Sequence, residues 1–281
     1  MKNQLISLFL LTVIFLSGCS TKHHDIKVIT LNIRYDNPAD SNNAWPHRAH
    51  IVSSFINAEK PDLLGMQEVL WHQYEYLDSA LTGYASVVVC RDDGRHLGEA
   101  VPVFYRTDRY KAHGNGTFWL SETPDVPGSK GWGAACTRIA TWVRLTDKSS
   151  GDTILFMNTH FDHISDSARV MAAIMLRQRL DKLAKNNRFI ITGDFNALPE
   201  SMAIQNIISD GLIKDSNAIA QTPPEGEKSS FNFFSDKDLS ERIDYIFVRN
   251  GMKVRTWNIK KVKEDGVFIS DHWPVIATIA E

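Results

Sequence analysis

Short apolar, β-branched runs that end in polar residues recur along the chain. Ile26 to Ile33 is one, and Phe189 to Thr192, which stops at Gly193-Asp194-Phe195-Asn196, is another. Such runs predict buried strands that open into loops at their polar ends. The other expected strands are Asp62–Met66, Tyr84–Cys90, Ala100–Tyr105, Gly116–Leu120, Arg138–Leu145, Asp152–Asn158, Ile243–Val248, Lys253–Val262 and Val275–Ile279.

Helical spacing of apolar residues appears between several of these runs. In 45–57 the residues Trp45, Arg48, Val52 and Phe55 fall on one face, and Pro61 follows the end. This pattern predicts an amphipathic helix. Further helices are expected over 69–81, from Ser165 or Asp166 to about Lys185, and over 201–209, whereas 215–235 is rich in Pro, Ser and Asn and reads as a surface loop.

The order of the elements indicates an α/β fold. Strands and helices are interspersed, but the strands are many and 138–145 with 152–158 read as a hairpin. This combination predicts two packed, mixed β-sheets with helices outside. Polar strand ends are spread from Asn32 to His272, so a single cleft must collect them, and we expect one domain over 26–281.

Composition narrows the range of partners. The chain has 281 residues, 43% of them hydrophobic, and a formal net charge of −2. A protein that tracks nucleic acid through many phosphates usually carries an excess of Lys and Arg. The balance therefore favours a small or locally held substrate and does not favour nucleic acid.

The N-terminus has the pattern of an export signal. Lys2 precedes an almost entirely apolar stretch, Leu5 to Leu16, and Leu16-Ser17-Gly18-Cys19 follows. This resembles the lipobox of bacterial lipoproteins, which implies a signal peptide over 1–18, a lipid on Cys19, a polar tether over 19–25 and attachment to the cell envelope, at the outer membrane or cell surface rather than the inner membrane. The alternatives are a plain secretory signal and a membrane helix, for which the stretch is short.

Cys90 and Cys136 remain after Cys19. Outside the cytoplasm they could form a disulfide. Both lie among apolar or small residues, so we expect two separate buried thiols instead. Their spacing is not that of a metal site.

The polar strand ends carry oxygen ligands and two imidazoles. They are Asn32, Glu68, Glu99, Asn158, His160, Asp162, Asp194, Asn196, Asp244, Asp271 and His272. Carboxylate and amide oxygens suit Mg²⁺ or Mn²⁺ rather than zinc. An imidazolium can stabilise a phosphoryl centre or protonate its leaving oxygen.

Taken singly, each of these residues has a structural interpretation. Gly193-Asp194-Phe195-Asn196 could be a turn, and Glu68 could be an acid at a helix N-terminus. Asp244 could cap a turn, and His160 could be a hydrogen-bonded buried histidine. Together, however, the residues favour a site.

Six stretches, in order, resemble the endonuclease/exonuclease/phosphatase superfamily of metal-dependent phosphoesterases. They are Thr30-Leu31-Asn32; Gln67-Glu68; Glu99 before Val103-Phe104-Tyr105-Arg106; Asn158-Thr159-His160; Gly193-Asp194-Phe195-Asn196; and Asp244-Tyr245 with Ser270-Asp271-His272. The resemblance covers Ile26 to the C-terminus. It implies a four-layered α/β sandwich.

The resemblance also implies roles. Glu68 would be the main metal ligand, with Asn32 and Asp271 nearby. Asp194 would activate the attacking water or bind a second metal, and Asn196 would position Asp194 or the phosphate. His272, oriented by Asp244, and His160, oriented by Glu99, would contact the phosphate. Asn158, Arg34, Arg138 and Arg169 are the candidate substrate-binding residues, although for each arginine a structural salt bridge is an equal alternative.

The function expected from the sequence is hydrolysis of a phosphodiester by in-line attack of an activated water, in a monomer that is exported and lipid-anchored. Thr117-Phe118-Trp119-Leu120-Ser121 resembles the deadenylase/nocturnin branch. One alternative is a phosphomonoesterase for sugar, inositol or nucleotide phosphates. Another is a catalytically silent binding module on the same fold. That alternative would be favoured if other residue types stood at the expected metal-ligand or histidine positions.

Overall fold

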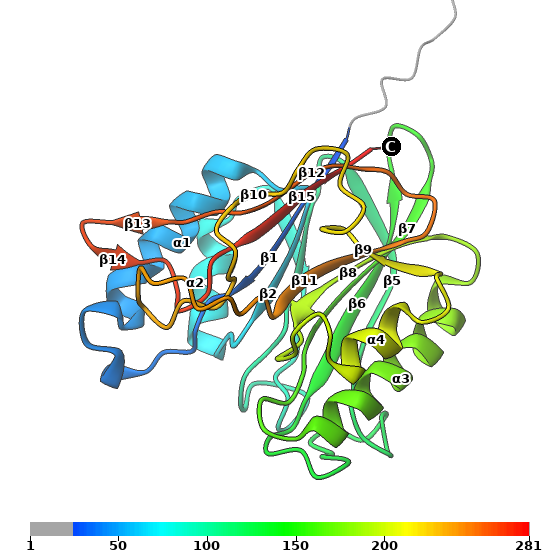
Figure 1. Ribbon diagram of the computed structural model, residues 1–281, viewed down its shortest axis with the longest axis horizontal. Helices are drawn as coiled ribbons and strands as arrows, with labels where there is room; N and C mark the ends of the chain where they lie inside the picture. The colour runs from blue at the N-terminus through cyan, green and yellow to red at the C-terminus, as the bar shows by residue number, and fades with distance from the viewer. Residues whose placement is uncertain (1–24, 281) are drawn as a thin grey trace, which may run out of the picture.

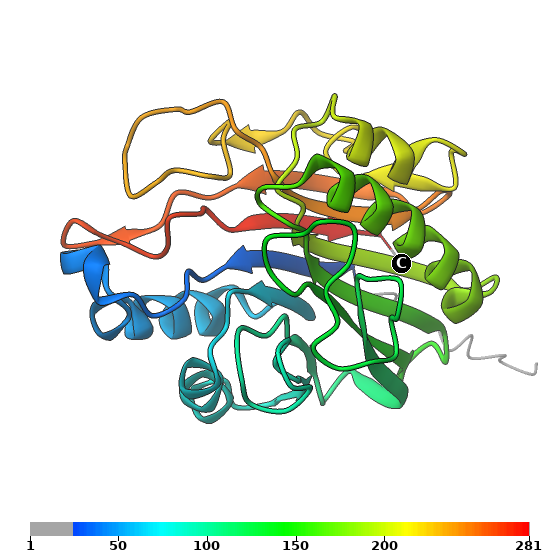
Figure 2. The same ribbon diagram turned by 90° about the horizontal axis from the view of Figure 1, so that it is seen from below.

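The computed structural model describes residues 25–280, which form four layers (Figure 1). Two large β-sheets face each other at the centre, and helices cover the outer face of each (Figure 2). The expected four-layered α/β sandwich is confirmed. The expected signal peptide over 1–18, Cys19 and all but the last residue of the tether lie outside the described residues.

The first sheet has seven strands and mixed direction. Its order is β10 (Glu225–Gly226), β12 (Val254–Ile259), β15 (Val275–Ile279), β1 (Ile26–Asn32), β2 (Leu63–Gln67), β4 (Val103–Arg106) and β3 (Tyr84–Val87). The central strands β1 and β2 are parallel, and β15 runs antiparallel to β1. Helices α1 (Trp45–Glu59) and α2 (Trp71–Ala80) pack on its outer face.

The second sheet has six strands. Its order is β5 (Tyr110–Trp119), β6 (Ile139–Asp147), β7 (Thr153–His160), β8 (Arg188–Asp194), β11 (Asp244–Arg249) and β9 (Ile213–Asp215). Strands β7 and β8 are parallel, and β11 is antiparallel to β8. Helices α3 (Asp166–Ala184) and α4 (Met202–Ile208) cover its outer face. A short helix, η1 (Pro38–Asn43), and a small hairpin of β13 (Lys263–Glu264) and β14 (Val267–Phe268) complete the described elements.

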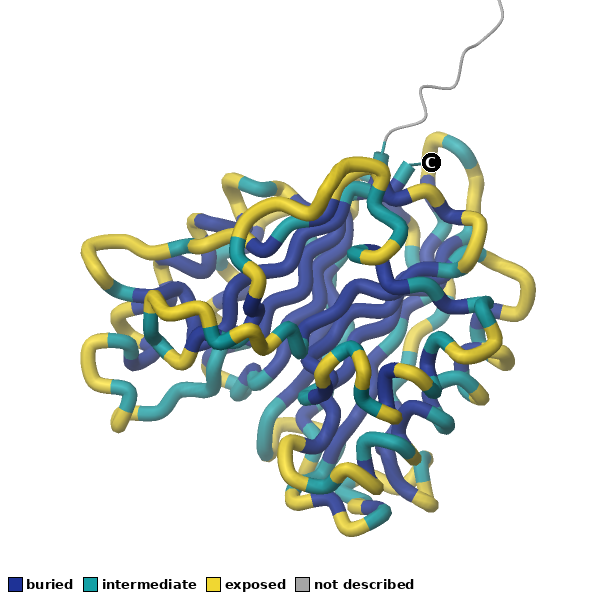
Figure 3. Tube along the Cα trace, viewed as in Figure 1, coloured by how far each residue is buried: buried dark blue, intermediate teal, exposed yellow. Residues whose placement is uncertain are grey.

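Burial on both faces explains why the central strands are continuously apolar. Along β8, Ile190 packs between the two sheets, whereas its neighbour Ile191 packs against α3 and α4. Strands covered on both sides read as unbroken hydrophobic runs rather than as alternating patterns. Figure 3 shows the buried backbone concentrated in these strands and the exposed backbone in the loops around them.

Several expected strands differ from the structure in length. The expected strand over 100–105 is β4, which begins only at Val103, and the expected strand over 253–262 is β12, which ends at Ile259. The expected strand over 84–90 ends at Val87, and Cys90 makes only an isolated bridge to Ala100. The expected short strand over 116–120 extends back to Tyr110, because β5 pairs with β6 along its whole length through a register shift at Ala112/Gly114. The expected hairpin is β6 and β7.

Cys90 and Cys136 are separate free thiols, as expected, although only Cys90 is fully buried. None of the helices within residues 25–280 combines the length and apolar character that crossing a membrane requires.

Candidate active site

The strand directions bring the polar ends to one edge of the sandwich. Strands β1 and β2 of the first sheet and β7 and β8 of the second all end there, and the antiparallel strands β11 and β15 begin there. The register places Asp194 directly between Asp244 and His160 on its two neighbouring strands. Groups that are far apart in the sequence therefore converge because six strand termini meet.

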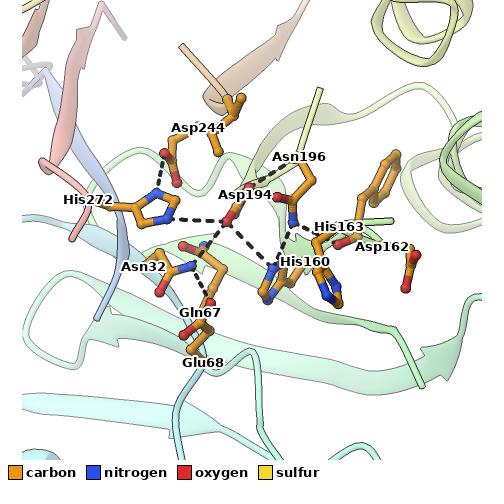
Figure 4. Close-up of polar contacts among 12 residues, drawn as sticks. Asn32, Gln67, Glu68, His160, Asp162, His163, Asp194, Asn196, Asp244 and His272 are labelled. Carbon is orange, nitrogen blue, oxygen red and sulfur yellow. Dashed lines mark hydrogen bonds and ion pairs between the residues drawn. The ribbon is translucent and has the colours of Figure 1, made fainter. Parts of the chain in front are cut away.

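A cleft of about 500 Å³ opens at this edge. Figure 4 shows its floor, where side chains from both sheets point toward Asp194. The residues that line the cleft are Arg34, Tyr35, Glu68, Arg91, Glu99, Cys136, Arg138, His160, His163, Asp194, Asn196, Phe231, Phe233, Glu241, Ile243, Asp271 and His272.

The expected pair of Asp244 and His272 is present. His272 Nδ1 lies 2.8 Å from Asp244 Oδ2, and its Nε2 lies 3.8 Å from Asp194 Oδ2. Burial alone would lower the pKa of His272, but the carboxylates of Asp244 and Asp194 outweigh burial and raise the pKa to about 10. The structure therefore holds a buried imidazolium against the cleft.

Asp194 is 1% exposed, and its carboxylate accepts two hydrogen bonds in addition to its approaches to His272 and His160. Its Oδ2 accepts from Asn32 Nδ2 at 3.0 Å, and its Oδ1 accepts from the Asn196 backbone N–H at 2.9 Å. Burial, followed by repulsion from Asp244, raises the pKa of Asp194 to about 7. A carboxylate with this pKa can exchange a proton with water near neutral pH.

His160 differs from His272 in charge. The side chain of Asn196 donates from Nδ2 to His160 Nε2 at 3.0 Å, and Asp194 Oδ2 lies 3.5 Å from the same nitrogen. Burial, then the positive charges of Arg138 and Arg91, hold the pKa of His160 well below its ordinary value. His160 is therefore neutral at physiological pH, with Nε2 as an acceptor.

The expected orientation of His160 by Glu99 is wrong. Glu99 Oε2 instead accepts from Arg91 Nη1 at 2.6 Å, and within residues 25–280 no hydrogen bond or ion pair joins Glu99 to His160. Burial, and then repulsion from the nearby carboxylate of Glu68, raise the pKa of Glu99. Asn196 takes the orienting place beside His160.

Glu68, Asn32 and Asp271 lie near one another and carry the oxygen ligands that a hard divalent cation prefers. Among the described residues, the acidic and histidine group whose ligand atoms all lie within 4.8 Å of one another is Asp194, Asp244 and His272. The Glu68 carboxylate accepts from Asn32 Nδ2 at 3.0 Å and from the Tyr35 backbone N–H at 3.1 Å. Burial and the charge of Glu68 raise the pKa of Asp271, although His272 and Arg34 oppose this. Two carboxylates that repel each other, the buried Asp271 and the half-buried Glu68, favour a bound cation, and their oxygens suit Mg²⁺ or Mn²⁺.

Three residues that follow the ends of β1, β2 and β8 have left-handed backbones. Glu68 has φ 60°, Arg34 has φ 58° and Asn196 has φ 47°. Such conformations are uncommon outside glycine and concentrate at functional sites. Each turns the chain sharply after a strand, which directs the side chain into the cleft.

Of the three candidate arginines, two reach the cleft. Arg34 lies 3.7 Å from Asp271, and Arg138 donates from Nη2 to His163 Nδ1 at 2.9 Å. Arg169 does not line the cleft, because its guanidinium donates to the Asp162 carbonyl and pairs with Asp166. The expectation that Arg169 binds substrate is therefore corrected.

Arg138 has unsatisfied donors. The residue is 5% exposed, yet its Nη1 and Nε make no hydrogen bond to any residue from 25 to 280, and Asp162 approaches Nε only to 3.7 Å. Asp162 is already occupied, since it accepts the backbone N–H groups of Ala135, Cys136, Ile164 and Ser165. Arg138 lines the cleft, and a buried guanidinium whose donors are incompletely paired favours an anion nearby, although the two unpaired nitrogens are themselves shielded from solvent.

Asn158 is also corrected, because it binds no substrate from its position in the structure. It is fully buried between the sheets and donates to the carbonyls of Met66 at 2.6 Å and Pro102 at 3.0 Å. Its Oδ1 accepts from Gln67 Nε2 at 2.7 Å and from Thr192 Oγ1 at 3.0 Å. Asn158 ties the two sheets together beneath the cleft.

Eight cleft residues were not expected from the sequence: Tyr35, Arg91, Cys136, His163, Phe231, Phe233, Glu241 and Ile243. His163 follows His160 by three residues, which is a signal that the sequence offered. Arg91 lies in a polar loop and the two phenylalanines lie in an irregular one, where no periodic pattern indicates which side chains turn inward.

The chain is similar to known phosphoesterases. The model of the Endonuclease/Exonuclease/phosphatase family matches residues 29–272. A protein of that description from Bacteroides vulgatus is 37% identical, with 92% of this chain and 100% of that one covered and a TM-score of 0.87. A mannosyl-6-phosphatase of Bacteroides thetaiotaomicron is 33% identical, with 91% and 100% covered and a TM-score of 0.86. The human nocturnin catalytic domain, with 19% identity, 91% and 93% covered and a TM-score of 0.72, shares the fold.

Proposed function

Because the chain belongs to the endonuclease/exonuclease/phosphatase family, whose members hydrolyse phosphoesters, we propose that it is a divalent-metal-dependent phosphomonoesterase for small sugar phosphates. Hydrolysis of a phosphoester follows from the family. The preference for a monoester, the sugar and the metal are the proposal.

The gathering of three positive side chains along the cleft, with the incompletely paired guanidinium of Arg138 among them, is the observation that carries this choice. A terminal phosphate has two ionisable oxygens and a diester phosphate has one, so a monoester makes better use of several cations. Arg138 faces the cleft together with Arg34 and the charged His272. Arginine forks match phosphate oxygens in pairs, which adds geometric selection to the charge.

Two further observations support a small sugar phosphate. The Bacteroides thetaiotaomicron mannosyl-6-phosphatase aligns with nearly the whole chain at 33% identity. The net charge of −2 is unlike that of a protein that follows a long polyanion. The phosphodiesterase expected from the sequence therefore becomes the alternative, and likeness to nocturnin supports only the fold.

Each group of cleft residues would have a different role in hydrolysis. A divalent cation held by Glu68 with Asn32 and Asp271 would polarise a phosphoryl oxygen. Asp194 would orient the attacking water and accept its proton, since its pKa lies near 7. His272 would stabilise the negative charge that develops on the phosphoryl group, and Arg138 would hold the remaining oxygens. Asn196 would keep the neutral His160 in place.

A substrate panel tests the proposed function. The protein that lacks residues 1–19 would be incubated with Mg²⁺ or Mn²⁺ and mannose 6-phosphate, glucose 6-phosphate, bis-p-nitrophenyl phosphate, single-stranded DNA and sphingomyelin. We expect kcat/KM to be at least about 10-fold higher for a sugar phosphate than for any diester. A diester as the preferred substrate would replace the proposal with its alternative, and no hydrolysis at all would favour a silent binding module.

Export and lipid attachment through Cys19 remain proposals that rest on the lipobox. In the described part, β1 begins at Ile26, next to the expected tether, and ends at Asn32, which is buried beneath the cleft and bonded to Glu68 and Asp194. The strand spans about 20 Å, so the cleft would open at the end of the sandwich opposite the attachment point, at the outer membrane or cell surface. The Cys19→Ala variant should be either released as a soluble monomer or left unprocessed. A variant that is processed normally and still partitions into the detergent phase would contradict the lipid anchor.

A further inference from the structure

Phe233 is exposed beside the catalytic centre. The residue is 71% exposed and lines the cleft. Single exposed apolar side chains are common on proteins and need no explanation by themselves. Two features distinguish Phe233 from the other exposed apolar side chains: its backbone conformation and the aromatic ring that its side chain contacts.

The backbone at this position is strained. Phe233 has φ 50° and the next residue, Phe234, has φ 52°. Two consecutive bulky residues in the left-handed region are unusual, because the Cβ atom crowds the backbone there. Strain of this kind persists only where surrounding contacts impose it, and it is found at ligand-binding positions.

The contacts that hold this backbone conformation come from the segment that carries Asp271 and His272. The backbone N–H groups of Asn232 and Phe233 both donate to the Asp271 carbonyl, at 2.7 and 3.1 Å. The buried Asn232 side chain donates to the Ser270 carbonyl at 3.2 Å and accepts from the Phe234 N–H at 2.8 Å. The position of Phe233 is thus fixed relative to Asp271 and His272.

Aromatic rings continue from the catalytic histidine to the exposed side chain. The Phe231 ring lies edge-on to the His272 imidazole, with centroids 5.0 Å apart, and the Phe233 ring follows at 5.9 Å from Phe231. Phe231 and Phe233 therefore form an aromatic shelf that leads outward from the phosphate-binding end. A substrate whose phosphate contacts His272 would extend its alcohol moiety along this shelf.

We propose that Phe233 is a specificity-determining residue that packs against the apolar C–H face of the substrate's sugar ring. This inference rests on the proposed function and adds to it the element that recognises the ring rather than the phosphate. A large, rigid aromatic surface suits such a ligand because it has few rotamers to immobilise.

The test compares a ring-bearing substrate with one that has no ring. Mannose 6-phosphate and glycerol 3-phosphate carry the same phosphate, so the ratio of their kcat/KM values isolates recognition of the ring. Phe233→Ala should lower this ratio roughly 5- to 10-fold, mainly through a higher KM for mannose 6-phosphate. Phe233→Tyr should retain the ratio. Met202→Ala, which removes a 70% exposed side chain from α4, outside the cleft, is the matched control.

Phe233→Gly separates recognition from folding. Glycine adopts positive φ without strain, so this variant should melt at the wild-type temperature or above it while losing the preference for the ring. If wild-type protein hydrolyses sugar phosphates and the Phe233 variants keep the wild-type ratio, the inference is wrong and the proposed function stands. If wild-type protein hydrolyses no sugar phosphate, both are overturned.

Discussion

Asp244 holds the imidazole of His272 through Nδ1 at 2.8 Å, and this leaves Nε2 of His272 facing Asp194. The pair comes from β11 and from the segment before β15, two strands in different sheets. The active site is therefore assembled only when the two sheets pack together. The site has an imidazolium at His272 and a neutral imidazole at His160. The difference arises because carboxylates adjoin His272, whereas His160 is buried near arginines.

Removing His272 should reduce kcat more than it changes KM. A charge-stabilising group in a closed site contributes on the order of 10²–10³ in rate, so His272→Ala should lose about that factor and Asp244→Asn somewhat less. Because the two act as one unit, the double variant should be barely slower than His272→Ala. Steady-state kinetics of the four proteins measures this, and strictly additive losses would show that Asp244 has a separate role.

Glu68→Gln should weaken metal binding without unfolding the protein, because it removes one negative ligand from a half-buried position. Calorimetric titration with Mn²⁺ should show a dissociation constant raised by about 10- to 100-fold. Glu225→Gln, at an exposed strand position, is the control. EDTA should abolish hydrolysis by wild-type protein, and Mg²⁺ or Mn²⁺ should restore it; full activity after exhaustive chelation would contradict the metal proposal.

Asn158→Ala should lower stability. The change removes the buried hydrogen bonds of the Asn158 side chain to Met66, Pro102, Gln67 and Thr192, which should reduce the free energy of unfolding by about 2–4 kcal/mol. Asn115→Ala, an exposed change on β5, should have little effect. Urea unfolding measures both. If Asn158→Ala instead kept wild-type stability and raised KM, the position would be a substrate contact after all.

Asp162 should make stability depend on acid pH. Burial would raise its pKa, but four backbone N–H donors outweigh burial and lower the pKa to about 2 from an ordinary value of 3.8. The unfolded chain therefore takes up a proton first as the pH falls. The stabilisation, about 2 kcal/mol, is present above pH 3.8 and is lost as the pH falls toward 2.

Urea unfolding of wild type and Asp162→Asn between pH 7 and pH 2 measures this contribution. The difference in their free energies of unfolding should shrink by about 2 kcal/mol over the lower part of that range. The exposed Asp181→Asn should track wild type throughout. A difference that stays constant with pH would mean that the Asp162 carboxylate is not held ionised by its donors.

The sequence predicted the strands and their polar ends because both depend on local patterns. Strand β8 is a continuous apolar run that ends at Asp194, and this required no knowledge of its neighbours. The pairing of Asp244 with His272 was reached through the family resemblance, since nothing local to either residue identifies the partner. The hydrophobic periodicity of the sequence could not predict the order of strands in the two sheets, because that order depends on long-range packing.

The errors have physical causes. Asn158 and His160 share one face of β7, but Asn158 lies two residues deeper, where the first sheet covers it. Glu99 was matched to His160, yet Arg91 folds back from the loop before it and takes the carboxylate. Phe233 was not identified because its role depends on a backbone conformation that phenylalanine rarely adopts.

The fate of the attacking water tests the central claim most directly. Mannose 6-phosphate would be incubated with wild-type protein and Mg²⁺ in water labelled with heavy oxygen, and the phosphate released would be followed by phosphorus NMR. If Asp194 directs water to the phosphoryl centre, the inorganic phosphate should carry one labelled oxygen, and Asp194→Asn should release almost none. Release of unlabelled phosphate, which would mean cleavage of the carbon–oxygen bond, or no release at all, would contradict the account.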